Sequence, residues 1–346
     1  MARKHARNEI NESIVISIRI RLARNFAGFP FPRQMDEAQA VDLVELVDVG
    51  LRKFDTFQRY DIKQISEEDA TLLQEQRLIS PALLNSKYGS AFITQDEGNV
   101  ISIMVNEEDH LREQYIYKSF DFLKAYERIS AVDDGLGSIF DLAFDEKLGY
   151  LTACPSNLGT GMRASVMMFL PGLVWNGGLK KLLTRLRAEG ITVRGAFGEG
   201  TKSEGYVYQI SNERTLGLSE MELLTQMDEV AQRICELEKS ARDEMLTKAK
   251  TEIKDRCMRA YGALSYCEIL SLPEFVEKMG DVKLGVIFGF LESDGFDEIH
   301  DFIEGMHPTT FRCNNGIQYA SEADCSIVRA ETVRKVLPKI VQVAKQ

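Results

Sequence analysis

The chain has 346 residues, 44% of them hydrophobic and 27% charged, enough for one large domain and a smaller one, each with its own core. Its net charge of -11 opposes non-specific binding to nucleic acid or to an anionic membrane, because an acidic surface gains nothing from displacing their counterions. No run of about 18 apolar residues and no apolar leader occurs, so we expect a cytoplasmic protein.

The first part of the chain alternates between strand and helix patterns. A β-branched run over 14–21 predicts a strand, and its alternation sends Arg19 and Arg21 to one face. Helical spacing with few breakers follows from 36 to 60. Further strands are predicted over 98–105, 149–153 and 165–170, with a helix over 179–189 and two strands around the loop 195–205.

The last third of the chain has a different pattern. Long, charged helical spacing begins near residue 219 and runs to 252. Further helices are expected over 253–272, 284–291 and 332–345, and strand patterns nearly vanish. We therefore expect a mixed α/β catalytic domain over 1–240 and an all-helical domain over 241–346.

Five arginines lie at predicted strand ends or in loops: Arg19, Arg21, Arg112, Arg163 and Arg194. A guanidinium stays charged and can grip two phosphate oxygens at once. A strand arginine often does no more than solvate an exposed face, so each of them alone is weak evidence. In a chain this acidic, an anion site must be a local cluster of such arginines.

A more specific signal is the segment that begins at Cys154 and reads Cys-Pro-Ser-Asn-Leu-Gly-Thr-Gly-Met-Arg. It resembles the signature loop of the phosphagen (guanidino) kinases. Other blocks resemble that family in the same order along the chain: Arg19-x-Arg21-x-x-Arg24, Asn106 to Arg112, and Gly198 to Thr201 with Ile210 to Asn212. The resemblance implies an α+β fold, with a glutamine-synthetase-like catalytic domain built on a mainly antiparallel sheet flanked by helices.

Within that family the chain is most similar to the bacterial protein arginine kinases of the McsB type. Only 18 residues precede Arg19, so we expect no N-terminal helical domain of the kind that closes over free substrate in the small-molecule kinases. The segments Asp255 to Gly262 and Leu284 to Val286 resemble the C-terminal domain of the protein kinases. The resemblance implies an open site that accepts arginine side chains in proteins.

The resemblance also implies roles for single residues. A guanidinium has a pKa above about 12 and attacks only after losing a proton, so the reaction needs a carboxylate base. The implied catalytic residues are Glu108 as the base, Cys154 in contact with the guanidinium, and Arg163. The nucleotide-binding set is Arg19, Arg21, Arg77, Arg112, Arg163 and Arg194, with Glu107 on the metal side and ATP and Mg2+ as cofactors. The implied substrate-binding residues are Glu108, Cys154, Lys202 and Glu204.

The chain departs from the family pattern at three places. Lys202 stands where these kinases usually carry a second carboxylate, and a lysine repels the substrate guanidinium. Either Glu204 or Glu199 replaces that carboxylate, or catalysis is weakened, or the acceptor differs from arginine. Arg77 stands where a histidine near the nucleotide base is common. In the segment 325–330, little survives of an element that binds phosphoarginine in the protein kinases.

Three functions therefore stay open: an active protein arginine kinase, a catalytically weakened adaptor that binds nucleotide or phosphoarginine proteins, and a kinase for a small guanidine. The resemblance implies self-association as a homodimer through the helical domain. It also implies work in protein quality control and stress response, with a zinc-binding activator protein, a heat-shock repressor and a Clp protease as partners. Six cysteines without a C-x-x-C pair suggest neither a zinc knuckle nor a disulfide framework in this chain.

Overall fold

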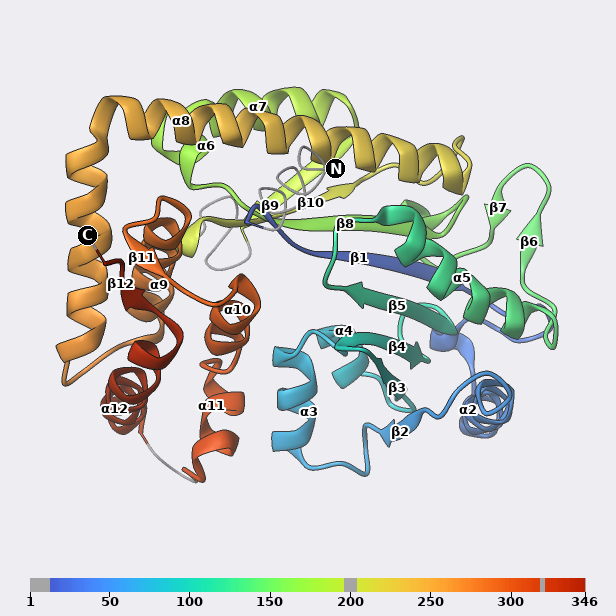
Figure 1. Ribbon diagram of the computed structural model, residues 1–346. Coiled ribbons are helices and arrows are strands. Elements are labelled where there is room, and N and C mark those ends of the chain that lie inside the picture. The colour runs from blue at the N-terminus through green and yellow to red at the C-terminus, as the bar shows by residue number, and fades with distance from the viewer. Residues whose placement is uncertain (1–12, 196–203, 318–320, 346) are drawn as a thin grey trace.

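The computed structural model of the chain describes residues 13–195, 204–317 and 321–345. Its centre is an eight-stranded sheet in the order β2-β3-β4-β5-β1-β8-β10-β9, in which every neighbouring pair runs antiparallel (Figure 1). The strands are β1 (Val15–Arg24), β2 (Gln58–Asp61), β3 (Ser90–Asp96), β4 (Asn99–Val105), β5 (Leu111–Tyr117), β8 (Met162–Phe169), β9 (Ile191–Gly195) and β10 (Val207–Asn212).

Strand β1 shows how the sequence divides the sheet into two faces. Ile18, Ile20 and Leu22 are almost completely buried, whereas Arg19 and Arg21 alternate with them and lie on the other face. The apolar face packs against α2 (Glu37–Leu51), α5 (Phe122–Gly137), α6 (Pro171–Trp175), α7 (Gly178–Ala188) and the start of α8 (Glu220–Tyr266). Arg19 and Arg21 share the opposite face, as predicted from the alternation, while the end of that face formed by β3 and β4 packs apolar side chains against α3 (Glu67–Glu75) and α4 (Pro81–Leu84).

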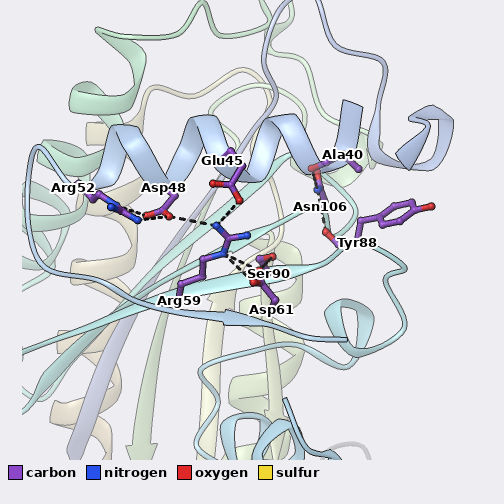
Figure 2. Close-up of polar contacts among 9 residues, drawn as sticks. All are labelled: Ala40, Glu45, Asp48, Arg52, Arg59, Asp61, Tyr88, Ser90 and Asn106. Atoms are coloured by element: carbon purple, nitrogen blue, oxygen red, sulfur yellow. Dashed lines mark hydrogen bonds and ion pairs between the residues drawn. The ribbon is translucent and has the colours of Figure 1, made fainter. Parts of the chain in front are cut away.

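A polar network holds α2 against the edge strand β2 (Figure 2). Arg59 of β2 pairs with Glu45 and Asp48 of α2 and with Asp61 of its own strand. The predicted helix over 36–60 is therefore too long. It ends at Leu51, and the residues after it turn back to pair with β3 at the edge of the sheet.

The C-terminal region is helical, as predicted, with α9 (Leu272–Ile287), α10 (Phe296–Glu304), α11 (Pro308–Asn315) and α12 (Glu322–Ile340). A two-residue strand pair, β11 (Leu291–Glu292) and β12 (Gln342–Val343), is its only strand structure among the described residues. A second hydrophobic core joins these helices through Phe275, Ile299 and Leu337. The expected α+β fold with a helical C-terminal region is confirmed.

Helix α8 connects the two parts of the molecule. It runs along the sheet and then bends into the C-terminal helices (Figure 1). The two helices predicted over 219–252 and 253–272 are one element, interrupted only by the non-helical backbone of Ala249. The core around the sheet extends along α8 to Ala241, so we keep a domain boundary near residue 240 as our proposal.

The remaining elements are short: η1 (Pro32–Gln34), α3 (Glu67–Glu75), α4 (Pro81–Leu84), β6 (Phe144–Asp145), β7 (Gly149–Tyr150), η2 (Pro155–Asn157) and η3 (Glu204–Tyr206). The predicted strand over 149–153 is thus only two residues long, because the chain leaves it for the loop that contains Cys154. The predictions for β4 and α7 are confirmed within a residue or two. No helix in the described ranges combines the length and the apolar character that a membrane crossing requires.

Candidate active site

The open face of the sheet gathers arginines from neighbouring strands. Arg21 of β1 lies directly opposite Arg163 of β8, and the next residue pair of the same face sets Arg19 opposite Ser165. Arg112 of β5 pairs with Ala23 on the other side of β1. The Arg163 guanidinium donates to the Ser211 hydroxyl at 2.9 Å, which fixes its direction.

These arginines repel one another strongly. Burial, followed by the charges of Arg77, Arg112 and Arg163, lowers the pKa of Arg19 to about 10. Burial and the same kind of neighbours hold the pKa of Arg21 well below its usual value, and its Nε is buried without a hydrogen-bond partner among the described residues. Burial, together with Arg194 and Arg112, lowers the pKa of Arg163 as well. Too few carboxylates lie near these arginines to balance their charges. The face is therefore suited to bind a polyanion.

The turn between β4 and β5 carries the two acidic residues of the site. Asn106 begins it with a left-handed backbone, and its side-chain amide donates to the carbonyls of Ala40 and Tyr88, as Figure 2 shows. Glu107 is buried, accepts from Arg112 at 2.8 Å and is hydrogen-bonded to Ser80. The next side chain, Glu108, is exposed to solvent. The turn therefore joins the arginine cluster through Glu107, and Glu108 follows it in the chain on the solvent side.

Asp109 ties this turn to the loop that contains Cys154. One of its carboxylate oxygens accepts from the backbone N–H of Ala153 at 2.6 Å and from the Asn25 amide at 2.7 Å. Cys154 follows directly, partly exposed, with its Sγ 3.0 Å from the Ser156 hydroxyl. The Asp109 carboxylate thus ties the turn that carries Glu108 to the loop that carries Cys154, although the two residues lie 46 positions apart in sequence.

Two glycines set the shape of the loop. Gly159 and Gly161 have φ of 108° and 61°, and a Cβ on Gly159 would meet the Thr215 carbonyl oxygen at 2.4 Å. A Cβ on Gly161 would likewise meet the Ala23 carbonyl oxygen at 2.6 Å. Close backbone contacts within the protein therefore require glycine at both positions.

Arg77 lies at the end of α3, with φ of 62°. Its backbone carbonyl accepts from the Gln114 amide at 2.7 Å, and its guanidinium reaches Met167 Sδ at 3.1 Å. It therefore lies on the same face as the arginine cluster, beyond Arg19. Of the predicted substrate-binding residues, Lys202 lies outside the described residues, and Glu204 is the first residue of η3.

Arg24, the third arginine of the first sequence block, does not belong to the site. It lies on the opposite face and is buried against Asp133. Alternation along the strand would have predicted this, since positions 19 and 21 share a face that position 24 does not. Ser80, Asp109 and Ser211 were missed from the sequence, because only their contacts with residues distant in the chain reveal their part in the site.

The donor groups at the site fit a magnesium ion that enters together with a nucleotide. Among the described residues, no group of three or more His, Cys, Asp or Glu side chains lies close enough to hold a metal ion alone. Magnesium keeps much of its water and needs only one or two carboxylates beside nucleotide phosphates. Glu107 supplies such a carboxylate at the edge of the arginine cluster. Its role on the metal side stays a prediction.

The comparisons with known proteins point to one family. Residues 43–241 match the model of the ATP:guanido phosphotransferase C-terminal catalytic domain, and residues 250–346 match that of the McsB protein-arginine kinase C-terminal domain. The protein-arginine kinase of Caldanaerobacter subterraneus is 39% identical over 96% of this chain and 99% of its own length. The protein-arginine kinase of Bacillus subtilis is 37% identical over 81% of this chain and 78% of its own.

A solved structure carries the same fold. The duplicated taurocyamine kinase of Schistosoma mansoni, with bound transition-state analogue components, superimposes with a TM-score of 0.61 at 27% identity. The match covers 72% of this chain and 38% of that duplicated enzyme. Sheet, signature loop, family models and relatives agree, and the chain belongs to the protein-arginine kinases of the ATP:guanido phosphotransferase family.

Proposed function

We propose that this chain transfers the γ-phosphoryl group of ATP to a guanidinium nitrogen of arginine side chains in proteins. The observation that carries the proposal is the cluster of Arg19, Arg21, Arg112 and Arg163 on the open face of the sheet, with Glu107 as its neighbouring carboxylate. The transition state of phosphoryl transfer spreads negative charge over the transferred group, and cations placed in advance stabilise it.

The acidic turn supplies the base in this proposal. Glu108 accepts a proton from the substrate guanidinium, and the freed lone pair attacks the γ-phosphorus. A nitrogen–phosphorus bond forms as the bridging oxygen–phosphorus bond breaks, and ADP leaves with that electron pair. Cys154 contacts the guanidinium from the neighbouring loop. A magnesium ion, when bound near Glu107, neutralises part of the phosphate charge.

The protein acceptor is supported by the relatives rather than by the site alone. Both relatives described above are named protein-arginine kinases, and the C-terminal helical region matches the domain particular to that group. The expected partners, a zinc-binding activator protein, a heat-shock repressor and a Clp protease, stay predictions, as do self-association and a cytoplasmic location.

The test is incubation with ATP, Mg2+ and an arginine-bearing protein, followed by mapping of acid-labile phosphate under non-acidic conditions. We expect phosphate on arginine side chains and ADP release that depends on the protein acceptor. A Glu108→Gln control should lose transfer, because an amide accepts no proton at neutral pH. ADP release with free arginine and none with protein would instead assign a small-guanidine kinase, and no transfer to either acceptor would contradict the proposal.

A further inference from the structure

Exposed apolar side chains lie on both sides of the loop that contains Cys154. On one side, the hairpin of β6 and β7 carries Phe144 and Leu148. On the other side, the segment before α8 and its first turn carry Leu216, Leu218 and Met221. Each of these five residues, here called the flanking surface, has an exposed fraction between 36% and 58%. Single exposed apolar residues are ordinary on a protein surface, but a group of them around one loop indicates a binding surface.

Gly159 lies between the two segments that carry the flanking surface. The backbone N–H of Tyr150 donates to the Gly159 carbonyl at 2.8 Å, and a Cβ on Gly149 would meet that same oxygen at 2.4 Å. On the other side, a Cβ on Gly159 would lie 2.7 Å from the Leu216 Cα. Cys154 precedes Gly159 by five residues in the same loop. The hairpin, the Cys154 loop and the segment before α8 therefore touch one another directly through their backbones.

Hydrogen bonds fix the backbone of both segments. One carboxylate oxygen of Asp145 accepts from the backbone N–H groups of Lys147 and Leu148 at 2.8 and 3.0 Å, which holds the turn of the hairpin. The Thr215 hydroxyl donates to the Leu158 carbonyl at 2.7 Å, which holds the segment before α8 against the Cys154 loop. The flanking surface is thus presented on an ordered backbone, so little further ordering is needed when a ligand binds.

The flanking surface lies within reach of the residues that neighbour a target arginine in a protein. In the proposed function, the guanidinium of that arginine contacts Cys154. An extended chain advances about 3.3 Å per residue, so residues two to four positions from the arginine lie roughly 7 to 13 Å from it. Because both segments of the flanking surface touch the Cys154 loop, side chains at these positions can pack on it.

The charges around the flanking surface favour a basic segment as its ligand. Within 144–148 and 213–222, four exposed carboxylates stand against two exposed cations: Asp145, Glu146, Glu213 and Glu222 against Lys147 and Arg214. This excess of negative charge attracts a chain that carries arginine. A second copy of this chain fits less well, because a twofold contact would set these carboxylates against the same carboxylates of the other copy.

We propose that the flanking surface binds apolar side chains that lie two to four positions from the target arginine in a protein substrate. The surface then determines specificity: it favours arginines with apolar neighbours over arginines with polar neighbours, and it does not touch the reacting atoms. The inference rests on the proposed function, because the contact with Cys154 defines where the target arginine lies.

The first test compares two acceptor peptides of equal length, each with one arginine and with either leucine or serine three positions away on both sides. For the wild-type chain, we expect a KM for the leucine peptide about three- to tenfold below that for the serine peptide, the scale for burying apolar side chains on a half-covered surface. A double variant, Phe144→Ser with Leu216→Ser, should remove this preference by raising the KM for the leucine peptide alone. Its kcat, its KM for ATP and its KM for the serine peptide should stay within twofold of wild type.

Leu237→Ser is the matched control. Leu237 has a similar exposed fraction of 40%, but it lies 16 residues beyond Met221 on α8, about 24 Å along the helix. The control should keep the KM values of both peptides. A double variant that raised both KM values equally would have a disturbed fold rather than a lost contact, and that result would count against the inference.

Equal KM values for the two peptides in the wild-type chain, or a preference that survives in the double variant, would overturn the inference and leave the proposed function intact. Transfer to a protein but to neither peptide would also overturn the inference alone, whereas no transfer to any arginine-bearing acceptor would overturn both. Sedimentation velocity should give the same oligomeric state for the wild-type chain and the double variant. Dissociation of the double variant would assign the flanking surface to a contact between copies of this chain and overturn the inference.

Discussion

Two arginines three positions apart on β1 have opposite surroundings. Arg21 faces the open side of the sheet among Arg19, Arg112 and Arg163, and burial and these charges hold its pKa well below its usual value. Arg24 faces the helices. Burial works to lower the pKa of Arg24, but the charge and hydrogen bonds of Asp133 outweigh it and raise that pKa.

The partners of Arg24 satisfy almost all of its donors. Its Nη2 bonds to Asp133 at 2.8 Å and to Glu220 of α8 at 3.2 Å, and its Nη1 donates to the Thr160 carbonyl at 2.9 Å. Its guanidinium carbon lies 3.6 Å from the centre of the Tyr150 ring. The same residue type therefore stabilises the fold where carboxylates surround it. Where other arginines surround it, it costs stability and is held ready for an external anion.

The largest expected effect is on activity at Arg21. Arg21→Met should lower phosphotransfer by about 10³-fold, the scale for losing one charge-stabilising group in this reaction class. The same change should raise the free energy of unfolding by about 1 kcal/mol, because it removes a buried charge from among like charges. The transfer assay measures the activity and urea denaturation measures the free energy of unfolding, both on one preparation. A variant that loses activity and stability together would contradict this account of the cluster.

Arg24→Met is the matched change on the other face. It should destabilise the chain by about 3–5 kcal/mol, since it leaves Asp133 buried and without its ion-pair partner. Urea denaturation followed by far-UV circular dichroism measures the difference from wild type. A loss of less than about 1 kcal/mol would mean that Arg24 does not anchor the fold.

The smallest effect concerns Glu113 on β5, which lies next to the ion pair of Arg24 and Asp133. Burial, followed by the nearby charge of Asp133, raises the pKa of Glu113 well above its ordinary value of about 4.5. The folded chain thus keeps a proton that the unfolded chain releases above that pH. Stability should therefore fall as pH rises above about 4.5, by up to about 1.4 kcal/mol per unit, until the folded group ionises.

Glu113→Gln should remove this part of the pH dependence, because the amide does not titrate. The measurement is the free energy of unfolding of both proteins across that pH range, in which all other groups contribute equally to the two curves. Parallel curves would show that Glu113 is ionised in the folded chain.

Much of the fold could be predicted from local patterns. Alternation placed Arg19 and Arg21 on one face, and helical spacing marked α7 and the second half of α12, because both are properties of neighbouring residues. The helix predicted over 284–291 met only the last turn of α9, and α10 and α11 were missed. The end of α2 could not be predicted in this way. The helical spacing continues past Leu51, and only the pairing of Arg59 with α2 and of β2 with β3 turns the chain there.

For the site, the sequence by itself determined which residue types are present and which blocks resemble a guanidino kinase. Tertiary structure alone decided their partners: Asp109 joins the turn with Glu108 to the loop with Cys154, and Glu304 meets Arg77 from 227 positions away. The physical reason is that a side chain's direction follows from its own backbone, whereas the charge that it meets comes from whichever distant segment packs beside it.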